Sequence, residues 1–78
     1  MNEKAWVSHI KRVLLGRTIN KVEYMSAKER TDLDWHRSPI MFRLNSGVWV
    51  YPSQDDEGNG AGSLFTNDKN LPIIPSIY

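Results

Sequence analysis

The chain has 78 residues, no cysteine and a formal net charge of +1. A chain of this length forms one domain with a small core, and the lack of cysteine excludes disulfides and thiolate metal sites. A net charge near zero argues against a dedicated nucleic-acid-binding protein, and no apolar run approaches the roughly 18 residues of a membrane span. The charged start contains no signal-peptide core, so we expect a cytoplasmic protein.

The first predicted element is an amphipathic helix over about residues 3–15, opened by Asn2 or Glu3. Trp6, Ile10 and Leu14 recur every four residues, which places them on one helical face. Gly16 follows at the position where a residue in the left-handed conformation would end the helix.

Residues 17–25 are predicted to form the first strand of a sheet. The apolar residues Ile19 and Val22 are three positions apart, whereas side chains on one face of a strand recur every two residues. This mismatch indicates a bulge near Asn20, because an extra residue returns both side chains to the same face.

A capping box follows the first strand. The Ser26 hydroxyl is placed to accept a hydrogen bond from the backbone N–H of Glu29, whose own side chain reaches back toward Ser26. We expect one or two helical turns that end near Asp34, after which Trp35 folds back onto the core.

The centre of the sheet is predicted to be a β-hairpin. Residues 40–44 alternate in polarity, and residues 48–51 return after a turn in which Gly47 accepts a positive φ. Residues 63–66 are short and apolar enough to add a further strand, so the sheet occupies about residues 17–66.

The C-terminal arm, residues 67–78, is predicted to be extended, because Pro72 and Pro75 interrupt any helix. Its large apolar side chains require cover, either along their own domain or on a neighbouring subunit. These side chains are Leu71, Ile73, Ile74, Ile77 and Tyr78.

A glycine-rich segment within residues 52–66 contains the densest group of potential cation ligands. Its glycines let the backbone turn in either hand, which suits a calcium or magnesium site and equally a solvated loop. The segment departs from the calcium-loop pattern at Thr66, which stands where a bidentate Glu is required. We expect a solvated loop and keep a divalent-cation or small-ligand site, with weak hydrolase activity, as the alternative. The candidate ligands are Asp55, Asp56, Glu57 and Asn59.

Three other patterns for chemistry are incomplete. Asp34 and His36 would point the same way on an extended backbone, but no second histidine lies nearby to complete a metal site. A triad of Ser53, Asp55 and His36 lacks the flanking glycines of a nucleophile elbow. No glycine-rich turn leads into Lys-Ser/Thr and a helix, as a phosphate loop would. We therefore predict no catalytic residue, no cofactor and no enzymatic activity.

The predicted strand 48–51 is apolar on both faces, with Trp49 and Tyr51 on one face and valines on the other. One face should meet the helix, and the second requires cover by the arm, by closure of the sheet or by another subunit. The carboxylates of Asp55, Asp56 and Glu57, here called the acidic loop, follow this strand in the sequence. Their negative charge disfavours a stacking platform for single-stranded nucleic acid. The predicted interaction surface consists of Trp49, Tyr51, Ile73, Ile74, Ile77 and Tyr78.

Residues 14–75 carry a sequence pattern that includes Pro52-Ser53-x-Asp55-Asp56-Glu57-Gly58-Asn59 and Leu64-Phe65-Thr66. This pattern resembles a family of short uncharacterised bacterial proteins. Proteins of this style also occur as products of integron gene cassettes, so the resemblance implies a bacterial, cytoplasmic origin. Because the family has no assigned activity, the resemblance implies no catalytic residues.

These patterns predict one α+β domain over residues 1–78, with an N-terminal helix packed on a three- or four-stranded antiparallel sheet. A partly open, SH3-like barrel is the alternative fold. The predicted function is a non-enzymatic binding or protein-interaction module. Its predicted partner is a second copy of the chain, giving a dimer, or another protein, and not nucleic acid or a membrane.

Overall fold

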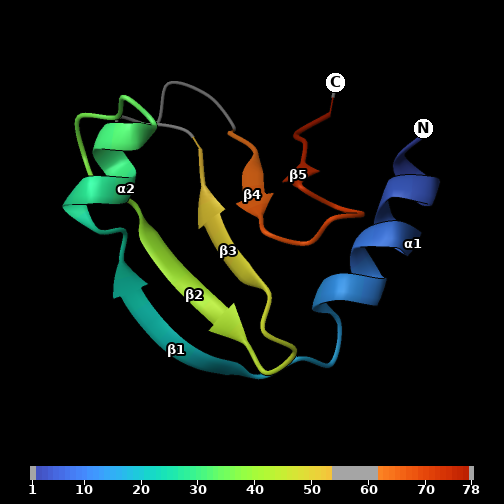
Figure 1. Ribbon diagram of the computed structural model, residues 1–78. Coiled ribbons are helices and arrows are strands. Elements are labelled where there is room, and N and C mark those ends of the chain that lie inside the picture. Colours follow the sequence, from blue (N-terminus) through green and yellow to red (C-terminus); the bar gives the residue numbers. More distant parts are fainter. Residues whose placement is uncertain (1, 54–61, 78) are drawn as a thin grey trace.

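The computed structural model describes residues 2–53 and 62–77. These residues form two helices and a five-stranded sheet of order β1-β2-β3-β4-β5, in which all neighbouring strands are antiparallel (Figure 1). The predicted α+β class is therefore confirmed. Within the described residues the sheet is open, with β1 and β5 at its two edges, so the alternative of an SH3-like barrel is wrong.

Helix α1 (Glu3–Leu14) has the predicted extent and both predicted end signals. The Asn2 side chain caps it by accepting a hydrogen bond from the backbone N–H of Ala5 at 2.8 Å. Gly16 follows with a φ of 75°, a conformation that glycine adopts without steric cost. In the described part of the chain, neither helix has the length and hydrophobicity to cross a membrane.

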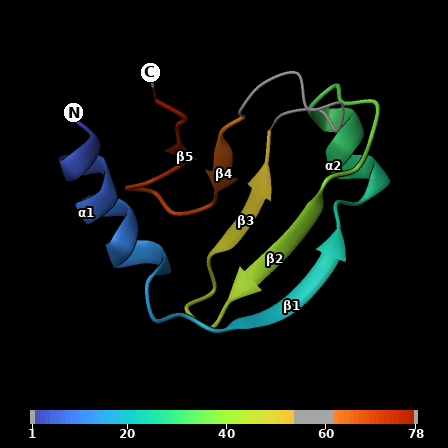
Figure 2. The same cartoon turned by 180° about the vertical axis from the view of Figure 1, so that it is seen from behind.

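Helix α1 lies at the β5 end of the sheet in both views (Figures 1 and 2). Its His9 Nε2 atom is 2.8 Å from the backbone oxygen of Asn70, which belongs to the connection between β4 and β5. Trp6 of the same helix lines a small depression together with Leu71 and Ile73. The helix therefore covers the C-terminal part of the sheet and leaves β1 uncovered.

Strand β1 (Ile19–Tyr24) pairs with β2 (Ile40–Leu44), and the register shifts between Ile19 and Lys21, which confirms the predicted bulge. Helix α2 (Ala27–Asp32) joins the two strands. Ser26 caps α2 as predicted, since its Oγ accepts from the backbone N–H of Glu29 at 3.1 Å. The Glu29 side chain reaches back as predicted, but its carboxylate accepts from the Ser26 hydroxyl, whereas a full capping box uses the Ser26 backbone N–H.

Strands β3 (Trp49–Pro52), β4 (Leu64–Thr66) and β5 (Ile73–Ile74) continue the sheet. The described sheet has five strands where the sequence predicts three or four, because the C-terminal arm pairs with β4 of its own domain. The flanking Pro72 and Pro75 lack an N–H donor, which keeps this last strand short.

The core contains side chains from both faces of the sheet. Val50 pairs with Phe42, whereas Met41 precedes Phe42 and therefore points to the other face. Thr66 is a buried polar residue whose hydroxyl donates to the Leu71 carbonyl and accepts from the Asp68 backbone N–H. The buried apolar residues are Val13, Met25, Met41, Leu44, Val50 and Leu71.

Candidate binding groove

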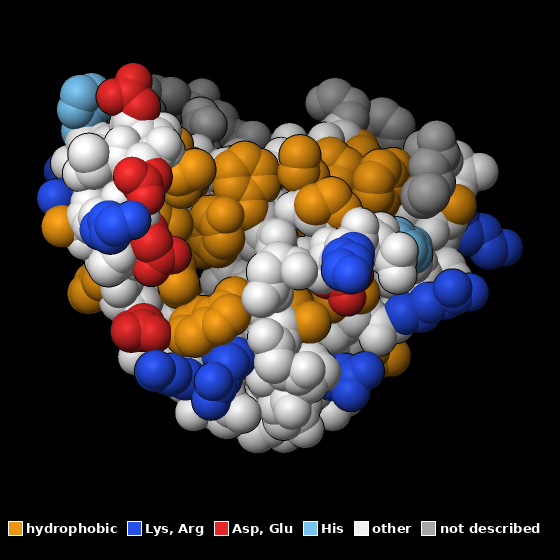
Figure 3. Space-filling model, in the orientation of Figure 1, with side chains coloured by type: hydrophobic (Ala, Val, Ile, Leu, Met, Phe, Trp, Pro, Cys, Tyr) orange, Lys and Arg blue, Asp and Glu red, His pale blue; other side chains and the backbone are white. Residues whose placement is uncertain are grey.

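One face of the sheet, here called the groove face, is defined by residues that lie directly opposite each other on neighbouring strands. Tyr51 pairs with Phe65, and Phe65 pairs with Ile73, so their side chains share this face. Trp49 and Met41 belong to the same face by their alternation with these partners. In Figure 3, hydrophobic side chains gather across the middle of the molecule, and acidic side chains line the flank where α2 lies.

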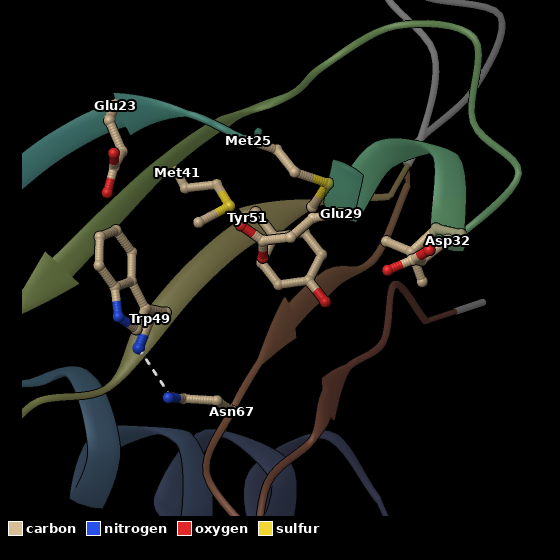
Figure 4. A pocket seen from close by; sticks show the side chains of 9 residues that line it. Glu23, Met25, Glu29, Asp32, Met41, Trp49, Tyr51 and Asn67 are labelled. Carbon is tan, nitrogen blue, oxygen red and sulfur yellow. Dashed lines mark hydrogen bonds between the residues drawn. The ribbon is translucent and has the colours of Figure 1, made fainter. Parts of the chain in front are cut away.

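A groove of about 500 Å³ lies on this face between the sheet and α2 (Figure 4). Its lining is mostly apolar and comes from β1, α2, β2 and β3, with three further residues that directly follow β1, α2 and β4. The apolar lining residues are Met25, Leu33, Met41, Trp49 and Tyr51, and the polar ones are Glu23, Glu29, Asp32 and Asn67.

An aromatic cluster of Trp35, Tyr51 and Phe65 ties the chain after α2 to the sheet. The Trp35 ring is 6.2 Å from Tyr51 in an edge-on arrangement and 6.3 Å from Phe65 in a stacked one, measured between ring centroids. Tyr51 and Phe65 complete the cluster at 5.6 Å. Such contacts stabilise beyond simple area burial, so they hold α2 against the groove face. The prediction that Trp35 folds back onto the core is confirmed.

Trp49 lines the groove at the end away from this aromatic cluster. Two cations contact its ring, and a hydrogen bond holds its backbone. The Lys21 ammonium and the Arg43 guanidinium each lie 5.8 Å from its ring centroid, a distance at which cations attract the ring. Its backbone N–H donates to Asn67 Oδ1 at 2.8 Å (Figure 4). This end of the groove is therefore aromatic with a basic border.

Three carboxylates form an acidic flank of the groove: Glu29 and Asp32 lie on α2, and Glu23 lies on β1 near Trp49 (Figure 4). Glu23 is 3.5 Å from the Lys21 ammonium, and Asp32 is 3.4 Å from that of Lys28. The side chains of Glu23 and Asp32 keep 45% and 66% of their surface exposed, so these ion pairs contribute little to stability. Their negative charge remains available to attract a cationic group that enters the groove.

The described residues show no arrangement for metal binding or nucleophilic catalysis. Among residues 2–53 and 62–77, no group of three His, Asp or Glu side chains is placed to hold a metal ion. The Ser53 hydroxyl donates to the Ser63 carbonyl at 2.9 Å and accepts from the Ser63 N–H at 3.1 Å. These two bonds extend the pairing of β3 with β4, so the Ser53 side chain has a structural role.

The structure divides the interaction surface predicted from the sequence. Trp49 and Tyr51 line the groove, while Ile73 lies on the groove face at β5 and Ile74 on the opposite face. Ile77 is 40% exposed and is not part of the groove lining. The remaining predicted residues, Tyr78 of the surface and Asp55, Asp56, Glu57 and Asn59 of the acidic loop, lie outside the described residues.

Sequence reasoning missed the acidic flank. Glu29 and Asp32 are three residues apart on a helix, a spacing that places both on one side. Glu23 pairs with Met41, and its position in β1 assigns it to the same face as Lys21. These two local signals were readable, but the convergence of α2 and β1 on one groove was not.

Comparison with family models, with curated proteins and with solved structures gives no match for this chain. The groove is therefore interpreted from its own residues.

Proposed function

We propose that the protein is a non-enzymatic binding module that captures a segment of a partner protein in the groove. The observation that carries this proposal is an apolar groove with Trp49 and Tyr51 in its lining and the acidic flank along one side. Tryptophan, tyrosine and methionine are enriched at protein interfaces, where tryptophan and tyrosine dominate the binding energy.

The lining also favours a particular partner chemistry. Met25 and Met41 have flexible, polarizable side chains that adapt to different apolar groups. The acidic flank favours lysine or arginine and disfavours a carboxylate, because like charges brought together across an interface are costly. The partner segment therefore combines apolar side chains with basic ones on the side that faces α2.

Nuclear magnetic resonance titration of the isotope-labelled protein tests this proposal. A short peptide of alternating Lys and Leu should shift the Trp49 indole and the Met41 methyl signals, and a Glu-Leu peptide of equal length should not. The double substitution Glu29→Gln with Asp32→Asn should weaken binding of the Lys-Leu peptide about tenfold, since each exposed pair contributes up to ~1 kcal/mol. Glutamine still completes a capping box, so α2 should persist in this variant.

The matched control is Glu3→Gln, which removes a carboxylate from α1, outside the groove lining. This variant should bind the Lys-Leu peptide as the unaltered protein does. Equal binding of the two peptides, or equal weakening by the control, would contradict the proposal. The cytoplasmic location and the bacterial, cassette-type origin implied by the resemblance stay predictions that this experiment does not address.

A further inference from the structure

Strand β1 forms a fully exposed edge of the sheet. All six of its residues are exposed, including Ile19 at 53%, Val22 at 62% and Tyr24 at 70%. Within the described residues, its only strand neighbour is β2, and both ribbon views show it at the outer border of the molecule (Figures 1 and 2). Exposed edges of this kind accept additional strands.

The orientation of the β1 backbone follows from one hydrogen bond. Met25 N–H donates to the Pro39 carbonyl at 3.0 Å, so the polar backbone groups of Met25 point toward the β2 side. Orientation alternates along a strand, and Glu23 and Lys21 therefore also point toward β2. The N–H and C=O groups of Val22 and Tyr24 point outward, where they are available to another strand.

The side chains near this edge are apolar on the face opposite to the groove face. Val22 pairs with Phe42 and Tyr24 pairs with Ile40, so these residues share that opposite face. Ile40 is itself 40% exposed, which extends the apolar surface from the edge strand onto its neighbour. Edge strands are usually protected by charged side chains, proline or a bulge. The bulge of β1 lies before Lys21, and beyond it Val22 and Tyr24 offer neither charge nor proline.

We propose that two copies of the chain pair antiparallel through β1, centred on Val22, and join their sheets into one. In this register Val22 lies opposite its own copy, and its outward N–H and C=O exchange hydrogen bonds with those of the copy. Lys21 of each chain then lies opposite Glu23 of the other, which places opposite charges in direct contact twice. A two-fold axis requires such a self-complementary strand.

Charge selects this register over its neighbours. A shift of two residues in one direction places Lys21 opposite Lys21 of the second chain, and a shift in the other direction places Glu23 opposite Glu23. Like charges directly across a strand pair destabilise it. Shifts by one residue are excluded because they bring the groove face of one chain level with the opposite face of the other. Lys21 and Glu23 also border the groove, but self-association is measured without a peptide, so its outcome is distinct from that of the proposed function.

Sedimentation velocity of the full chain over a range of concentrations tests the proposal by charge exchange. The unaltered protein should form a reversible dimer. Lys21→Glu alone and Glu23→Lys alone should each raise the dissociation constant roughly tenfold or more, because both contacts become repulsive. An equimolar mixture of the two variants should restore the dimer as a heterodimer, since opposite charges again face each other.

Two controls keep the experiment decisive. Lys28→Glu reverses the charge of a more exposed lysine on α2, outside the groove lining, and should leave the dimer unchanged. Val22→Pro removes an outward N–H that the β2 ladder does not use, so it should abolish the dimer while circular dichroism remains native. A chain that is monomeric at every concentration overturns the proposal. A dimer that persists in Val22→Pro, or a variant mixture that stays monomeric, also overturns it.

Discussion

The two edges of the sheet differ in length, cover and composition. The β5 edge has two residues, lies next to α1 and is flanked by Pro72 and Pro75. The β1 edge has six residues, all exposed, with its outward backbone groups unprotected by proline. Because a short, covered edge cannot accept another strand and a long, bare one can, we assign stability to the β5 edge and association to the β1 edge.

The largest expected effect is on the β5 side, at Leu71, which is 1% exposed. Leu71→Ala should lower the free energy of unfolding by about 2–5 kcal/mol, through lost burial and the cavity left behind. Urea denaturation at fixed protein concentration measures this loss. The control is Leu15→Ala, since Leu15 is 69% exposed and its truncation should change stability by less than about 0.5 kcal/mol. Equal losses of unfolding free energy in the two variants would contradict the stabilising role that we assign to the β5 edge.

A smaller effect is expected from the hydroxyl of Thr66, which closes the connection between β4 and β5. Thr66→Val should cost about 1–3 kcal/mol, because the Leu71 carbonyl and the Asp68 N–H lose their partner in a buried setting. Thermal unfolding should show a fall of about 4–8 °C per kcal/mol at this chain length. Thr31→Val is the matched control on α2, where the residue is exposed. A control variant that loses as much stability would contradict the assignment.

The smallest expected effect on stability concerns the acidic segment with Asp55 and Asp56, which follows β3 in the sequence. A binding module that does not use this segment should have the same melting temperature in EDTA as in millimolar calcium or magnesium. A cation at 100 times its dissociation constant would instead add about 2.7 kcal/mol of stability. A rise of several degrees that disappears in Asp55→Asn with Asp56→Asn would establish the alternative cation site and add a third functional region.

Local signals predicted most of the fold. The Asn2 and Ser26 caps, the bulge near Asn20 and the turn at Gly47, whose φ is 93°, each depend on residues only a few positions apart. Steric and hydrogen-bonding preferences of that range are encoded in the sequence itself. The pairing of β5 with β4 was less readable, because only Ile73 and Ile74 form it and their alternation is too short to recognise.

The groove required information that no local pattern contains. Glu23 comes from β1, whereas Glu29 and Asp32 come from α2, and they share one groove only because α2 folds over the groove face. The contact that sets this position is Trp35 with Tyr51 and Phe65, across a long stretch of sequence. Spacing predicts which residues share an element, but not which face of a sheet that element covers.

The strand order also has a consequence for folding kinetics. Each strand pairs with the next one along the chain, and even the connection through α2 has a modest entropic cost, because the cost of loop closure grows slowly with length. The contact between His9 and Asn70 spans 61 residues and requires both ends of the chain to meet. Local contacts form faster than distant ones, so we expect the meander to assemble first. Helix α1 then docks last on refolding and detaches first on unfolding.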